Sequence, residues 1–239
     1  MKRLLRRLAL TLVITAAIIL SSNPAIDSAS NKINHTATNQ IAGATQNLWA
    51  TTNNSEVWGN SGALMMPLAA QIAASRNPAG QPLTAQQKKY LRADFGDLVD
   101  RATINYNAKL LDRWSNGERE VHVGEVDAAA QAFCDRIYIR ADHQPQDTAQ
   151  LVLLAHELTH FQQCLQQGGL QKFGASYFAA YQQANQDYAR NQFEQAARDQ
   201  EKKFIKHLCQ QIDCQRPRGR YYLNYRGTNA KLPVKISAN

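Results

Sequence analysis

Two histidines separated by three residues constrain this chain more than any other feature. His156 and His160 lie within residues 151–165, LVLLAHELTHFQQCL. Residues four apart lie one above the other on a helix, so both imidazoles can reach one point. The apolar residues on either side are typical of a buried helix, and a buried polar pair needs partners. The pattern therefore indicates a metal site, and an exposed helix with two solvated histidines is the alternative.

The residue after the first histidine suggests the chemistry of this site. Glu157 follows His156 directly, so it points beside the shared point rather than at it. Histidine nitrogens bind zinc, and in the pattern H-E-x-x-H the glutamate takes a proton from the attacking water. We therefore predict Zn²⁺ held by His156 and His160, with Glu157 as the catalytic general base of a hydrolase.

A catalytic zinc site needs a third protein ligand. Such sites use three side chains and leave the fourth position for water. The best downstream candidate is Glu194, in a segment over residues 191–199 that has the composition of a helix. Two alanines, at 196 and 197, leave room for this helix to pack closely against another. The competing candidates are Asp187, Glu201 and His207.

Three tyrosines downstream of the motif are candidates for a catalytic role. Tyr177, Tyr181 and Tyr188 could stabilise the oxyanion that forms during hydrolysis. Packing is the more common role of a tyrosine in a helical segment, so each also has a purely structural interpretation.

The first 29 residues differ in composition from the rest of the chain. Residues 1–7 contain four basic side chains, residues 8–20 are apolar except for two threonines, and small polar residues follow. This order predicts a secretory signal peptide, cleaved between Ser22 and Ser30. An uncleaved anchor is the alternative, but the apolar run is shorter than the roughly 20 residues that a membrane span needs. We expect a periplasmic or secreted protein.

The charge of the exported chain limits its partners. Removing residues 1–29 takes away four basic residues and one acidic residue, so the formal charge of +8 falls to +5. A modest basic excess is compatible with weak association with anionic polymers of the cell envelope. No recognition motif for nucleic acid accompanies it, so we expect no nucleic-acid partner.

Four cysteines remain in the exported chain, and export makes disulfides plausible. They allow three pairings, and proximity in the sequence favours Cys209 with Cys214 and Cys134 with Cys164. Zinc ligation by cysteine is the alternative, although the spacing lacks a second pair to complete a tetrahedral site. A free Cys164, four residues after His160, could approach the metal.

Periodicity and capping residues predict several helices. Thr84 and Gln87 form a capping-box pattern for a helix through Arg92, and Asp147-Thr148 begins the motif helix, which Gly168-Gly169 ends. The other helical predictions cover residues 63–75, with an interruption at Pro67, then residues 127–133, and a long region over residues 177–207.

Alternation of apolar and polar residues predicts strands at 99–106, 118–123 and 136–140. The last of these places Ile137 and Ile139 on one face and Tyr138 on the other. Its edge could hold an extended peptide by backbone pairing, or it could be an ordinary strand of the core.

From Thr84 to about Glu201 the chain resembles a bacterial family of metallopeptidase domains. These domains occur in polymorphic toxins and in proteins linked to extracellular contractile injection systems. The most specific matching piece is LAHELTHFQQ, with the HExxH core and a pair of glutamines after the second histidine. The looser pieces are FGDLVD at 95–100, AF at 132–133, IYIR at 137–140 and FEQAARD at 193–199.

The resemblance implies a helix-rich, zincin-like α+β domain with a small sheet before the HExxH helix. It implies His156, His160 and Glu194 as metal ligands and Glu157 as the base. The exported context, the cysteines and the basic C-terminal region are not part of the family pattern. We therefore divide the chain into a signal peptide (1–29), a flexible linker (30–62), the metallopeptidase domain (63–208) and a basic tail (209–239).

The first functional hypothesis is an exported zinc-dependent metallopeptidase that acts on a peptide or protein substrate. The second is a non-catalytic binding module of the cell envelope, in which zinc is structural. The third is an amidase that acts on peptidoglycan. A fourth protein ligand, such as Cys164, would favour the binding module, whereas an open fourth metal position would favour a hydrolase.

Overall fold

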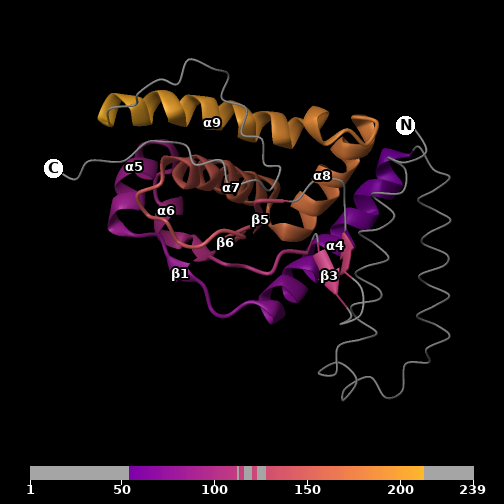
Figure 1. Cartoon of the computed structure of the whole chain (residues 1–239). Coiled ribbons are helices and arrows are strands. Elements are labelled where there is room, and N and C mark those ends of the chain that lie inside the picture. The colour runs from indigo at the N-terminus through magenta and orange to yellow at the C-terminus, as the bar shows by residue number, and fades with distance from the viewer. Residues whose placement is uncertain (1–53, 112, 116–119, 123–127, 213–239) are drawn as a thin grey trace.

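Helices dominate the computed structural model, which describes residues 54–111, 113–115, 120–122 and 128–212 (Figure 1). A small mixed sheet accompanies the helices, which confirms the predicted α+β class. The predicted signal peptide, most of the predicted linker and most of the basic tail lie outside the described residues. Among the described helices, none is long and apolar enough to cross a membrane.

The main sheet has four short strands in the order β1-β2-β6-β5. Its central pair, β2 (Thr103–Asn105) and β6 (Arg136–Ile139), is parallel. The outer strands β1 (Gln81–Pro82) and β5 (Ala130–Phe133) are antiparallel to their neighbours. Strand β6 was predicted correctly, but both of its edges are paired, so it has no free edge for a peptide. A separate antiparallel pair joins β3 (Arg113–Ser115) and β4 (Glu120–His122).

The motif helix α7 (Thr148–Gln167) has the predicted ends. The Asp147 side chain accepts a hydrogen bond from the backbone N–H of Ala149, and Gly168 ends the helix with a φ of 85°. The predicted capping box of α5 (Ala85–Phe95) is also present. These ends were predictable because the capping bonds are local: side chains make them at the two N-termini, and the backbone N–H of Gly168 makes them at the end of α7.

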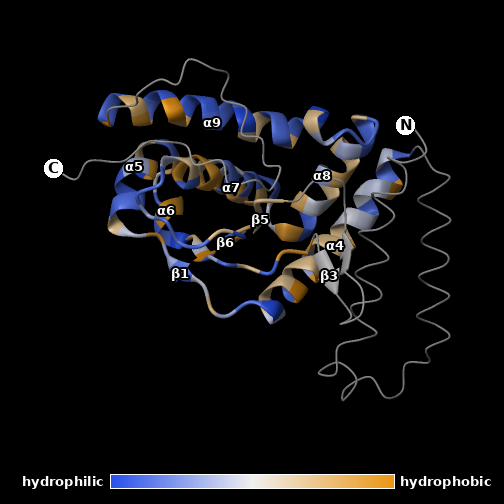
Figure 2. Ribbon diagram, in the orientation of Figure 1, coloured by the Kyte–Doolittle hydropathy of each residue, from blue (hydrophilic) through white to orange (hydrophobic). Residues whose placement is uncertain are grey.

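The remaining helices pack on α7 or on its neighbours. They are α4 (Ser55–Arg76), α6 (Leu98–Arg101), α8 (Leu170–Gln183), the 3₁₀ turn η1 (Tyr188–Arg190) and α9 (Gln192–Gln211). Helix α9 lies alongside α7 at the outside of the molecule (Figure 1). Figure 2 shows α9 as mostly hydrophilic, with separate hydrophobic residues along it, whereas hydrophobic residues gather in α7. This difference matches an outer helix that packs on a buried one.

Both faces of the sheet are covered. Ile137 and Ile139 belong to the main core together with apolar residues of α7, such as Leu154. Tyr138, on the other face, packs in a second cluster with Ala69 and Ala73 of α4 and is 2% exposed. The predicted alternation is therefore right, but α4 buries the second face as well.

Helix α4 corrects two expectations. It begins at Ser55, inside the stretch expected to be a linker, and it continues through Pro67 without interruption. Its contact with α8 is close: a Cβ added to Gly62 would lie 2.3 Å from the carbonyl oxygen of Gly174. Proline removes one backbone donor, and packing against α8 and the sheet compensates for that loss.

Three other predictions fail in part. Residues 130–133 of the predicted helix at 127–133 form β5, because pairing with β6 overrides the helix preference of alanine. The predicted strand at 99–106 begins as α6 and becomes β2 only at Thr103. The predicted long helix is divided between α8 and α9, where Asn185 and Gln186 adopt positive φ values of 56° and 60°.

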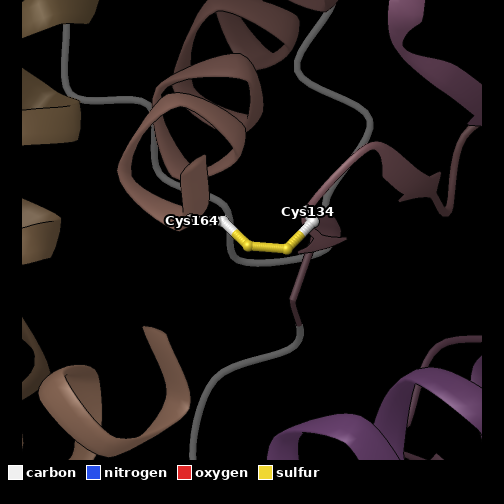
Figure 3. Close-up of a disulfide and its surroundings, with 2 residues drawn as sticks. All are labelled: Cys134 and Cys164. Carbon is white, nitrogen blue, oxygen red and sulfur yellow. A yellow bond between two sulfur atoms is a disulfide. The ribbon is translucent and has the colours of Figure 1, made fainter. Parts of the chain in front are cut away.

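Cys134 and Cys164 form a disulfide, as predicted, which joins the β5–β6 turn to α7 (Figure 3). Cys134 lies in the left-handed region, with a φ of 54°. Cys209 is also disulfide-bonded. Its predicted partner, Cys214, lies outside the described residues.

Candidate metal centre

The two motif histidines meet at one point, as their spacing predicts. Their Nε2 atoms are 3.1 Å apart. Glu194 reaches the same point from α9, with Oε2 at 3.4 Å from His156 Nε2 and Oε1 at 3.4 Å from His160 Nε2. The three ligand atoms lie within 4.8 Å of one another, and all three residues are buried. The structure therefore brings the three predicted ligands together.

The group has the chemistry of a metal site. A tetrahedral ion with bonds of about 2.0–2.1 Å keeps its ligand atoms roughly 3.3–3.4 Å apart. The Nε2–Nε2 distance of 3.1 Å is close to that separation, and so are the two distances of 3.4 Å, which reach different oxygens of Glu194. Glu194 Oε2 is buried, and its distance of 3.4 Å from His156 Nε2 is long for a hydrogen bond, so a bound cation would compensate its charge better. The residues fit a bound metal ion, and this geometry does not decide which ion it is.

The Nδ1 atom of each histidine, on the opposite side of the ring from the shared point, contacts a second side chain. Glu201 Oε1 lies 2.5 Å from His156 Nδ1, and Gln163 Oε1 lies 2.9 Å from His160 Nδ1. Gln163 also donates from Nε2 to the backbone oxygen of Phe193, over 3.0 Å. These contacts turn both Nε2 atoms toward the shared point.

Sequence analysis identified neither supporting role. Glu201 was considered as a competing ligand, and its position two helical turns after Glu194 places it on the same face of α9. Gln163 belongs to the glutamine pair of the resemblance, and its spacing of three residues from His160 is the signal for this contact.

The other candidates take different positions. Asp187 caps η1 by accepting from the N–H of Ala189, and His207 Nδ1 lies 3.0 Å from Asp94. Neither belongs to the metal group. Of the three tyrosines, Tyr177 donates to Glu194 Oε1 over 2.7 Å, whereas Tyr181 packs against Trp58. Tyr188 is 51% exposed and interacts electrostatically with Glu194.

Glu157 lies close to His156, His160 and Glu194 but is not part of the candidate ligand group. The residue is 5% exposed, and its carboxylate makes no hydrogen bond to any described side chain. Burial raises the pKa of Glu157, and the neighbouring His156 and His160 partly offset that rise. A carboxylate with no hydrogen bond to a described side chain and with a raised pKa is suited to accept and release a proton.

Without a metal ion, the centre contains an internal ion pair. Burial lowers the pKa of His156, but hydrogen bonds to Glu194 and Glu201 outweigh it and raise that pKa to about 10. Burial raises the pKa of Glu194, but the charges of His160 and His156 outweigh it and lower that pKa to about 2. At neutral pH His156 is therefore a cation and Glu194 an anion.

Comparison with known proteins identifies one related region. Residues 113–168 match the family model of the eCIS core domain. The match contains His156, Glu157 and His160 but ends before Glu194. No curated protein and no solved structure matched the chain. The part of the chain that carries the motif helix is thus related to a domain of extracellular contractile injection systems, as the resemblance suggested.

Proposed function

We propose that this chain is an exported zinc-dependent metallopeptidase that hydrolyses peptide bonds. One observation carries the proposal: a buried group of two histidines and one glutamate lies beside a second glutamate, Glu157, whose carboxylate makes no hydrogen bond to a described side chain. A purely structural metal site has no need of the second carboxylate. Its position next to the ligands is the position of a general base.

The number of ligands supports a catalytic site over a structural one. Structural zinc sites are closed by four protein ligands, whereas catalytic sites use three. Among the described residues, only His156, His160 and Glu194 form the group. Cys164 is bonded to Cys134, so its thiolate is not available as a fourth ligand. This was the feature that would have favoured a binding module.

The residues of the chain divide the proposed reaction among them. A zinc ion held by the three ligands would supply a Lewis acid that polarises a carbonyl group and makes a bound water more acidic. Glu157 takes a proton from the attacking water at its carboxylate. It then passes that proton to the leaving amine. Glu201 and Gln163 keep the two imidazoles in place, and Tyr177 holds the Glu194 carboxylate.

A cation lies beside the centre in the described structure. Arg198 Nη1 is 4.0 Å from Glu194 Oε2, and the Arg198 side chain is 32% exposed. Its Cζ atom is 6.0 Å from the Tyr188 ring. In the proposed reaction, Arg198 and Tyr188 are the candidates to stabilise negative charge on the carbonyl oxygen. The Cys134–Cys164 disulfide supports export, because disulfides persist in oxidising compartments.

The test is hydrolysis of a broad peptide mixture by the zinc-loaded chain lacking residues 1–29, with Glu157→Gln measured beside it. We expect cleavage by the wild type alone, with equal zinc content in both proteins. Equal turnover by Glu157→Gln would exclude this mechanism. If neither protein cleaves peptides although both bind zinc, purified peptidoglycan is the next substrate. Failure there too would favour the binding module.

A further inference from the structure

A groove with an uncharged lining lies between α7 and α9, on the opposite side of this helix pair from Glu157. It has a volume of about 410 Å³. Contacts of Gln163 with Phe193 and of His156 with Glu201 show that the two helices run antiparallel. Each residue turns a helix by about 100°, so Thr159 and Gln162 project from the flank of α7 opposite Glu157. The groove therefore lies on the other flank of α7 from Glu157.

The lining of the groove is uncharged and rich in amides. Five of its eight lining residues are glutamines: Gln162, Gln163, Gln166, Gln192 and Gln200. Glutamines are 24 of the 239 residues of the chain, so five of eight is far above their average share. The amides of Gln162, Gln166 and Gln192 make no hydrogen bond to any described residue. They can therefore both donate to and accept from a ligand.

The groove lacks what the recurring modes of peptide recognition need. Its walls are helices, whose backbone groups are bonded internally, so it offers no sheet edge. Its apolar residues are Ala196 and Phe193, and Phe193 is 8% exposed, so no apolar pocket receives an anchoring side chain. None of its lining residues is a cation that would bind a phosphate or a carboxylate. This lining favours a neutral ligand that both donates and accepts hydrogen bonds.

We propose that this groove binds a neutral oligosaccharide. Sugar hydroxyls donate and accept hydrogen bonds, as glutamine amides do, and the volume is within the usual range for small-ligand sites, about 300–1,000 Å³. The floor of the groove is Gln163, which also holds His160 and the backbone of Phe193. This binding site does not depend on the proposed peptidase activity.

The test is saturation-transfer NMR of the zinc-loaded chain lacking residues 1–29 with neutral oligomers of glucose, galactose, mannose and N-acetylglucosamine. The groove variant is Gln166→Ala with Gln192→Ala, both exposed residues of the lining. The matched control is Gln171→Ala with Gln195→Ala, exposed residues of α8 and α9 outside the groove. Loss of two hydrogen-bonding amides predicts binding about tenfold weaker in the groove variant and unchanged in the control.

Three results would overturn this proposal. One is that no oligomer of the panel binds. Another is that an oligomer binds equally well to the groove variant. The third is that both double variants weaken binding to the same extent, which would place the sugar elsewhere. Circular dichroism of each variant confirms that the fold is retained before binding is compared.

Discussion

Helices α7 and α9 supply the same metal group but differ in how they are held. Fourteen of the twenty residues of α7 are buried, against five of the twenty in α9. Helix α7 carries a recognisable motif inside the core, whereas α9 is an amphipathic outer helix that contributes isolated carboxylates. The comparison shows that a site can depend equally on a segment with a strong sequence signal and on one with almost none.

Removing the ligand on α9 tests whether the two helices contribute equally. We expect Glu194→Ala and His160→Ala each to abolish stoichiometric zinc binding, because two protein ligands do not complete the site. Asp187→Ala, which removes a rejected candidate, should keep full binding. Metal content after gel filtration measures the effect. Full zinc content in Glu194→Ala would show that another residue is the third ligand.

The docking of α9 depends on few residues, so one core substitution should disturb it. Phe204 is fully buried between α9 and the core. Phe204→Ala should lower the free energy of unfolding by about 3–5 kcal/mol, measured by urea denaturation. Lys206→Ala, on the exposed side of α9, should change it by less than about 0.5 kcal/mol. A similar small change for Phe204→Ala would mean that α9 is held mainly by the metal centre.

Glu201, which contacts His156 Nδ1, should affect zinc affinity less than a metal ligand does. Glu201→Gln keeps a hydrogen-bond acceptor near His156 Nδ1 but removes its charge. We expect zinc affinity to fall by about 10–100-fold, as outer partners of metal ligands usually contribute. Competition with a chromophoric chelator measures it, with the exposed Asp199→Asn as the control. An unchanged affinity would limit Glu201 to a structural contact.

The internal ion pair predicts a pH dependence. His156 has a pKa of about 10 in the metal-free protein, so it carries a proton throughout pH 7–9, and zinc must displace that proton. Zinc affinity should therefore rise about tenfold per pH unit over this range. Glu194, with a pKa of about 2, is already ionised and adds nothing to the slope. A flat profile would show that His156 is neutral before zinc binds.

The same pKa values predict the stability of the metal-free protein. The raised pKa of His156 stabilises the fold fully below its unfolded value near 6.5, and this contribution is lost as pH rises through about 10. The lowered pKa of Glu194 stabilises the fold above pH 4.5 and is lost as pH falls toward about 2. Thermal unfolding should therefore occur at the highest temperature between about pH 4.5 and 6.5.

Local spacing made the motif helix predictable. His156, Glu157 and His160 take their relative positions from helical periodicity alone, and the helix ends follow from Asp147 and Gly168. The disulfide between Cys134 and Cys164 was predictable only as the favoured one of three pairings. Residues 130–133, which are rich in alanine, were predicted as helix because strand pairing with β6 is a long-range interaction. The alternation in 136–140 could not predict that Tyr138 is buried, because α4, which covers it, lies more than 60 residues away in the sequence.

What the sequence by itself determined is the α7 half of the centre and the choice of Glu194 as the best third ligand. Only the tertiary structure decided that Glu201 contacts His156 Nδ1 and stays outside the group that could bind a metal. Glu194 and Glu201 lie on one face of α9, so which of them reaches the histidine Nε2 atoms depends on the axial position of α9 along α7. Packing of α9 against many residues that are distant in the sequence sets this axial position, and no local sequence pattern encodes it. The glutamine-lined groove has the same origin, because it forms only where the two helices meet.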